Sequence, residues 1–168
     1  MTLILHVVIS LIGIASGFVV VGGLLNARRL DRWTALFLAT TVATSVTGYF
    51  LPAAHILPSH IVGAVSLVIL AIAIVARYRR HLAGGWRRGY VISAVAALYL
   101  NVFVGIVQAF LEVPALKAAA PTQSEAPFVM TQLAALLVFM AVGAVSVIRF
   151  RTEPTHAPAA VRVASSGM

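Results

Sequence analysis

Apolar residues gather in five long segments, separated by short stretches that hold nearly all of the charged residues. The segments are Leu3–Leu25, Trp33–Leu51, Pro58–Ala76, Gly89–Leu111 and Phe128–Ile148. Each approaches the roughly 20 residues that a helix needs to cross about 30 Å of hydrocarbon. Because a spanning segment must satisfy its own backbone hydrogen bonds, the pattern predicts an all-α membrane bundle of five transmembrane helices.

The second segment is the most polar of the five and admits two interpretations. It either crosses the membrane as one helix or, together with the short connection Pro52–Leu57, forms a re-entrant hairpin. Its hydropathy is lowered by the hydroxyl residues Thr40, Thr41, Thr44, Ser45 and Thr47. We expect a crossing.

Composition supports a membrane location. Of the 168 residues, 61% are hydrophobic and only 10% are charged, whereas soluble proteins carry about 25% charged residues. The chain has no cysteine, which excludes disulfides, thiolate metal sites and thiol catalysis but leaves haem held by histidine open. Hydrolase and phosphate-binding motifs are also missing from the sequence, so we do not expect an enzyme.

The net charge of +8 is explained by membrane topology and not by nucleic-acid binding, because the basic residues flank the apolar segments. With five spans all arginines fall on one side, which the positive-inside rule makes cytoplasmic. They are Arg28, Arg29, Arg32, Arg77, Arg79, Arg80, Arg87, Arg88, Arg149, Arg151 and Arg162. The other side carries Lys117, so we expect the amino terminus outside and the carboxyl terminus inside.

The ends and the longest connection complete the expected organisation. Residues 1–151 are expected to form one transmembrane domain. Residues 152–168 show no periodic pattern of apolar residues and are expected to be a disordered cytoplasmic tail.

The first apolar run lacks a basic start and is longer than the apolar core of a signal peptide, so it is interpreted as a retained helix. The connection Glu112–Pro127, rich in proline and alanine, is expected to cap the outer face.

The fourth segment carries the best functional clue. Asn101, Gly105, Gln108 and Glu112 recur at i, i+4, i+7 and i+11, which places them on one helical stripe. Hydrocarbon satisfies no amide or carboxylate, so this stripe must face protein, water or a ligand.

Polar residues of other segments extend the stripe into a predicted outward-opening pocket. The added residues are Thr44, Thr47 and Gln132. Such a pocket suits a quinone carbonyl, a small polar solute or a lipid head group, with Glu112 accepting a proton at its mouth. The alternative is that these groups only bond between helices, for about 1 kcal/mol each.

Three histidines, His6, His55 and His60, fall at the outer end. His6 and His60 each head a face of small residues, so their imidazoles are expected to meet between the first and third segments. One hypothesis is axial ligation of a b-type haem by this pair; another adds His55 and Glu112 as a zinc site, although no HxxxH spacing occurs. The remaining alternative is that both are interfacial residues.

Two resemblances bear on these hypotheses. LHVVISLIGIASG and PSHIVGAVSL resemble segments of small bacterial b-type cytochromes, which implies His6 and His60 as haem ligands. LDRWTALFLATTVATSVTGYFLP, ALYLNVFVGIVQAF and APTQSEAPF resemble uncharacterised small polytopic inner-membrane proteins of Gram-negative bacteria, which implies a bacterial inner-membrane location and no particular activity.

Further patterns predict packing. Gly13 and Gly17 form a GxxxG face for close helix approach. Asp31, which lies among arginines, is expected to form an ion pair. The basic loop RYRRHLAGGWRR is explained by topology, with anionic-lipid binding as the alternative.

The sequence thus favours a non-catalytic accessory or binding subunit with a polar pocket in its outer half. Haem- or quinone-dependent electron transfer is the alternative function, and an oligomeric small-solute transporter is the third. The expected partners are the lipid bilayer and a second copy or a larger membrane complex.

Overall fold

The computed structural model describes residues 2–49 and 58–150, and these ranges are helical throughout apart from short connections. The elements are α1 Thr2–Leu25, α2 Asp31–Gly48, α3 Pro58–Ile74, the π-helical turn η1 Val75–Arg79, α4 Trp86–Glu112, α5 Pro114–Ala119 and α6 Ala126–Arg149. By length and composition α1, α4, α6 and the α3–η1 unit qualify as membrane spans. The all-α prediction is therefore confirmed for these residues, with four candidate spans.

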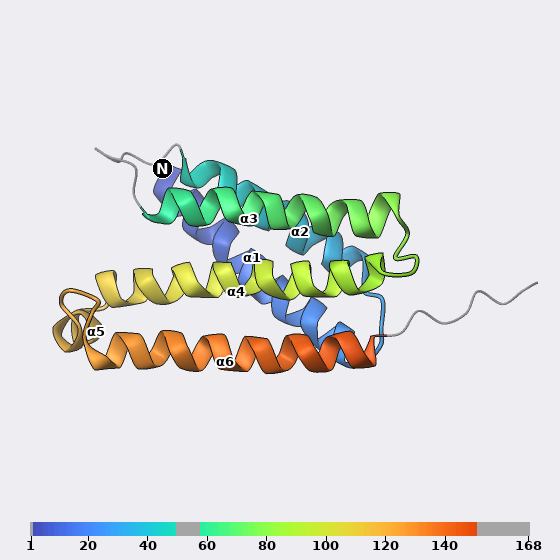
Figure 1. The fold of residues 1–168 in the computed structure, drawn as a ribbon. Helices are drawn as coiled ribbons and strands as arrows, with labels where there is room; N and C mark the ends of the chain where they lie inside the picture. Colours follow the sequence, from blue (N-terminus) through green and yellow to red (C-terminus); the bar gives the residue numbers. More distant parts are fainter. Residues whose placement is uncertain (1, 50–57, 151–168) are drawn as a thin grey trace, which may run out of the picture.

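The helices form a bundle in which α4 is central. Figure 1 shows α3, α4 and α6 lying side by side, with α1 crossing behind them obliquely and α2 beside α1 and α3. α4 packs against α1, α3 and α6, whereas α6 packs mainly against α4. Residues placed on different faces of α4 consequently belong to different interfaces.

The second predicted segment is one unbroken helix over Asp31–Gly48, with no hairpin inside it. At about 1.5 Å per residue its 18 residues extend roughly 27 Å. It is too polar to count among the four candidate spans. Several of its hydroxyls bond back along the helix, as Thr40 Oγ1 does to the Leu36 carbonyl at 2.7 Å, which lowers the cost of burying them.

Several predicted boundaries need correction. α4 begins at Trp86, three residues before the predicted start, and the third segment continues through η1 to Arg79. The connection after Glu112 was predicted without a helix but contains α5, which starts at a proline and continues with the helix formers Ala, Leu and Lys. His55, the 52–57 connection and the tail after residue 150 lie outside the described residues.

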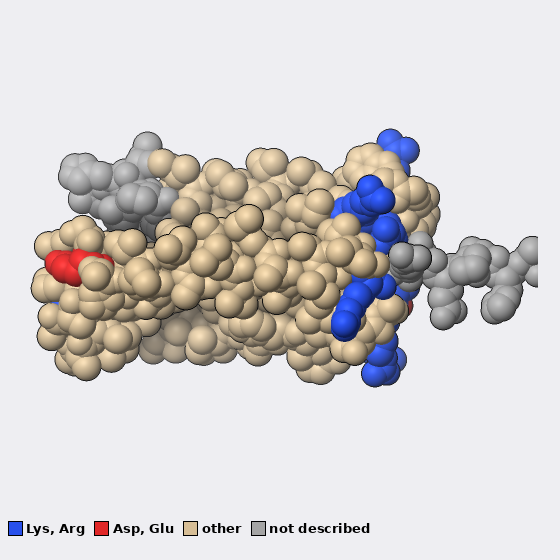
Figure 2. All heavy atoms as spheres, turned by 60° about the horizontal axis from the view of Figure 1, so that its bottom comes forward, with Lys and Arg blue, Asp and Glu red and all other residues tan. Residues whose placement is uncertain are grey.

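The described arginines gather at one end of the bundle, shown in Figure 2, which we call the arginine end. They are Arg28, Arg29, Arg32, Arg77, Arg79, Arg80, Arg87, Arg88 and Arg149. Lys117, Glu112 and Glu125 belong to the opposite end, which carries α5 and the start of α1 (Figure 1). This segregation of charge agrees with the pattern that the sequence predicts.

The apolar core occupies the half of the bundle next to the arginine end. Its buried side chains include Val20, Leu24, Phe37, Leu38, Leu70, Ala73, Tyr90, Val91, Ala94 and Leu98. Gly17 permits this packing, because a Cβ atom there would lie 2.5 Å from Leu98 Cδ1 and 2.9 Å from Phe37 Cε2. The predicted packing role of the GxxxG face is thereby confirmed at Gly17.

Candidate functional site

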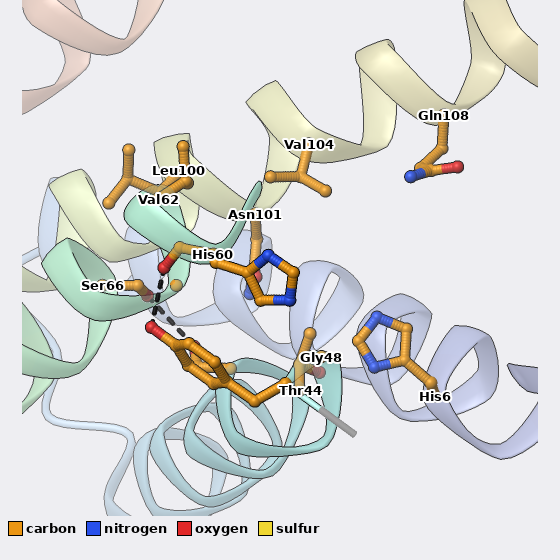
Figure 3. A pocket seen from close by; sticks show the side chains of 13 residues that line it. His6, Thr44, Gly48, His60, Val62, Ser66, Leu100, Asn101, Val104 and Gln108 are labelled. Atoms are coloured by element: carbon orange, nitrogen blue, oxygen red, sulfur yellow. Dashed lines mark hydrogen bonds between the residues drawn. The ribbon is translucent and has the colours of Figure 1, made fainter. Parts of the chain in front are cut away.

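A cavity of about 110 Å³ lies between α1, α2, α3 and α4, and we call it the four-helix pocket. Its polar lining consists of His6, Thr44, Ser45, Tyr49, His60, Ser66, Asn101 and Gln108. Val62, Leu100 and Val104 supply apolar walls, and Gly48 and Gly63 supply open backbone. Figure 3 shows side chains from all four helices converging on it.

His6 is held by a hydrogen bond to α2. Its Nδ1 atom lies 2.9 Å from Thr47 Oγ1, and the Thr47 hydroxyl donates its own hydrogen to the Ala43 carbonyl at 2.7 Å. When the Thr47 hydroxyl keeps its hydrogen on the Ala43 carbonyl, it accepts from His6, and Nδ1 of a neutral His6 then carries the proton. Nε2 is left with a lone pair that accepts hydrogen bonds or binds a metal ion.

Asn101 lies where α1, α2 and α4 meet. Its Nδ2 atom donates to Thr41 Oγ1 at 3.1 Å, and Thr41 is completely buried. Gly13 on α1 lies against this pair, because a Cβ atom there would lie 3.4 Å from Thr41 Oγ1 and 3.5 Å from Asn101 Nδ2, both ordinary contact distances. An amide nitrogen has two hydrogens, so Asn101 keeps donor and acceptor capacity after bonding Thr41.

The α2–α3 side of the pocket is closed by Tyr49 and His60. Their rings lie 5.4 Å apart between centroids, and the Tyr49 hydroxyl donates to the His60 carbonyl at 2.7 Å. Deeper between the same helices, Ser45 Oγ donates to Ser66 Oγ at 3.3 Å. These contacts set the register of α3 against α2 and hold His60 at the pocket wall (Figure 3).

The structure brings together most, but not all, of the residues singled out in the sequence. His6, His60, Thr44, Asn101 and Gln108 line the four-helix pocket, and Thr47 supports it by bonding His6.

Gln132 and Glu112 are not among the pocket residues. Gln132 Nε2 donates to the Phe103 carbonyl at 3.2 Å, because α6 packs on a different face of α4 from α1 and α2. Glu112 is exposed in the last turn of α4. The predicted pocket thus divides into a four-helix cavity and a separate α4–α6 contact.

Sequence reasoning missed Tyr49, Ser45 and Ser66 as pocket residues. A single serine in an apolar segment carries no signal of the face it occupies, and the Ser45–Ser66 pair exists only once α2 and α3 are in register. Tyr49 follows directly after α2, so its position depends on where that helix ends.

The chemistry of the pocket suits a neutral polar ligand. Among its described lining residues there is no carboxylate and no lysine or arginine, while imidazole, hydroxyl and amide groups are abundant. Within residues 2–49 and 58–150 no group of three or more His, Cys, Asp and Glu residues is close enough to hold a metal ion. Comparisons with protein-family models, curated proteins and solved structures find no match for the chain.

Proposed function

We propose that the chain is a five-span protein of the bacterial inner membrane, with its amino terminus outside and its carboxyl terminus in the cytoplasm. In this arrangement α2 is the fifth span. Its length of roughly 27 Å and its packing along α1 support this role. The gathering of the described arginines at one end supports the orientation.

Within this topology the protein acts as a non-catalytic binding subunit whose four-helix pocket holds the head group of a quinone. The observation that carries this assignment is the set of complementary groups around one small cavity. With the proton on Nδ1, His6 Nε2 would accept from a hydroxyl of the reduced ligand, and the amide nitrogens of Asn101 and Gln108, about two helical turns apart, would donate to different carbonyl oxygens of the oxidised ligand. The neutral lining matches a quinone, because both the oxidised quinone and the fully reduced hydroquinone are uncharged.

The size of the pocket favours a single ring over a porphyrin. Pockets that enclose drug-sized ligands measure about 300–1,000 Å³, whereas the four-helix pocket measures about 110 Å³. Haem propionates also favour cationic partners, and none is among the described lining residues. A haem between His6 and His60 is therefore the second candidate, and it predicts a Soret absorption band.

The apolar core favours binding over transport. Phe37, Leu38 and Leu98 are at most 3% exposed and lie between the four-helix pocket and the arginine end. A solute moving along the bundle would have to pass through these packed side chains. A pocket that ends against a packed core suits a ligand that enters and leaves by the same route.

Binding of ubiquinone-1 to the full chain in lipid nanodiscs tests the proposal. Gln108→Leu removes an amide from the pocket, and Gln132→Leu removes an amide from the α4–α6 contact as a matched control. We expect calorimetric titration to show a Kd raised about tenfold or more for Gln108→Leu, which corresponds to about 1.4 kcal/mol, and an unchanged Kd for Gln132→Leu.

Two results would contradict the quinone assignment. One is the absence of saturable binding, or an equal Kd in both variants. The other is an absorption spectrum of the purified protein with a Soret band that His6→Ala abolishes, which would make the protein a cytochrome.

A further inference from the structure

A second polar cavity lies at the arginine end, remote from the four-helix pocket. It has a volume of about 220 Å³ and is formed where the start of α2 meets η1 and the loop that follows. The residues around it are Arg29, Asp31, Arg77, Tyr78, His81 and Leu82. The cavity is therefore rich in cationic groups from two connections that are far apart in the sequence.

Arg77 is the fixed charge of this cavity. It lies in the π-helical turn Val75–Arg79 and is only 7% exposed. Its guanidinium packs over the Tyr90 ring at 5.1 Å and donates to the Asp31 carboxylate. A guanidinium stays charged when buried, so Arg77 places a permanent positive charge in a site of low dielectric constant.

The backbone after η1 is shaped to complete the cavity. His81 and Leu82 adopt φ angles of +47° and +59°, a left-handed conformation that side-chain-bearing residues rarely adopt. The conformation is held by a hydrogen bond from the Leu82 amide to the Ala76 carbonyl at 3.0 Å, and by burial of the Leu82 side chain. In this backbone conformation the His81 side chain lines the cavity.

The charges of the cavity do not balance. Arg29 and Arg77 contribute two positive charges, Asp31 contributes one negative charge, and His81 adds a further positive charge when protonated. The Asp31 side chain is 81% exposed, so water screens its carboxylate while Arg77 stays shielded. An anion that contacts Arg29, Arg77 and His81 together would compensate the excess.

We propose that this cavity binds the phosphate group of an anionic ligand, with Arg29 and His81 as exposed contacts and Arg77 as the buried anchor. A phosphate has the charge and the acceptor oxygens that several guanidinium and imidazole donors satisfy at once. The group comes either from a lipid head group at the membrane surface or from a soluble phosphate compound. This inference is independent of the quinone proposal because the two cavities share no residue.

Two binding measurements on the full chain in detergent micelles distinguish the sources. Inorganic phosphate tests the soluble source by calorimetric titration. Phosphatidylglycerol tests the lipid source by native mass spectrometry, with diacylglycerol as the phosphate-free lipid control. Saturable binding of phosphate alone supports a soluble ligand, and retention of phosphatidylglycerol but not diacylglycerol supports a lipid ligand.

Substitutions inside and outside the cavity test whether binding occurs there. Arg29→Gln and His81→Gln alter exposed residues, so folding should persist, and each is expected to weaken binding about fivefold or more. Arg88→Gln removes an exposed arginine at the same end but outside the cavity, and it should leave binding unchanged. The proposal is overturned if neither probe binds, or if Arg88→Gln weakens binding as much as Arg29→Gln does, because attraction would then be a general property of the basic surface.

Discussion

The two halves of the bundle are built from the same helices but packed in different ways. Next to the arginine end, α1, α2 and α4 bury Leu24, Phe37 and Leu98 almost completely. Toward the opposite end, the same helices carry His6, Thr44 and Asn101 around a cavity. Close apolar packing and the polar cavity are thereby separated along the length of the helices, so one half holds the bundle together while the other half keeps a polar space open.

The contrast originates in side-chain size at the helix contacts. At Gly17 the absence of a Cβ atom lets Leu98 and Phe37 approach closely. Near Gly48, a Cβ atom would lie 3.6 Å from His6 Cε1, an ordinary contact distance. Apolar side chains interdigitate in the first region, and polar side chains bond in pairs in the second, which leaves space between the pairs.

The largest effect is expected from a cavity-forming substitution in the packed half. Leu98→Ala removes a fully buried side chain and should lower the free energy of unfolding by about 2–4 kcal/mol. Val104→Ala, on the same helix but at the pocket wall, should cost less than about 1.5 kcal/mol. Equilibrium unfolding in mixed micelles measures both, and equal losses would show that the two halves are packed alike.

A smaller effect is expected from adding a methyl group. Gly17→Ala places a carbon against Leu98 and Phe37, so it should destabilise the bundle by about 1–3 kcal/mol. Gly22→Ala on the same helix meets no atom within 4 Å and should be neutral or slightly stabilising, because alanine favours helix. Thermal unfolding of the two variants checks this pair. If Gly17→Ala were neutral, α1 would not be closely packed there.

The smallest effect concerns pH at the end opposite the arginines. Loss of hydration tends to raise the pKa of Glu125, but hydrogen bonds from its own backbone, from Thr122 and from Ser124 outweigh it and hold the pKa below its ordinary value of 4.5. A lowered pKa means that the carboxylate stabilises this turn above about pH 4.5, and that this stabilisation is lost as the pH falls through the lowered pKa.

Amide hydrogen exchange at Thr122 and Ser124 measures this dependence. After correction for intrinsic exchange rates, protection in the unaltered chain should decrease on acidification, whereas protection in Glu125→Gln should be low and independent of pH. An unchanged pH dependence in the variant would assign the titration to another group. The four-helix pocket has no carboxylate among its described lining residues, so binding there should not follow this titration.

Periodicity predicted the helices and the stripe of α4 because both follow from local spacing. Asn101 and Gln108 lie on one face of any helix, so their common location needed no tertiary information. The partner of Gln132 depends on which face of α6 meets α4, which no local pattern specifies. The predicted ion pair of Asp31 exists, but its partner is Arg77, 46 residues away, since packing of η1 against the start of α2 decides the pairing.

The composition of α2 has a consequence for how the chain is assembled. A helix with so many hydroxyl groups gains little by partitioning into lipid on its own. His6 and Ser10 of α1 provide bonding partners for Thr47 and Thr44 of α2, so in the proposed topology α2 gains most if the first helix is still at the insertion site when the second has been synthesised. Both then enter the bilayer as one hairpin, and weakening this interface should reduce the amount of protein that is inserted before it changes the stability of protein that has already folded.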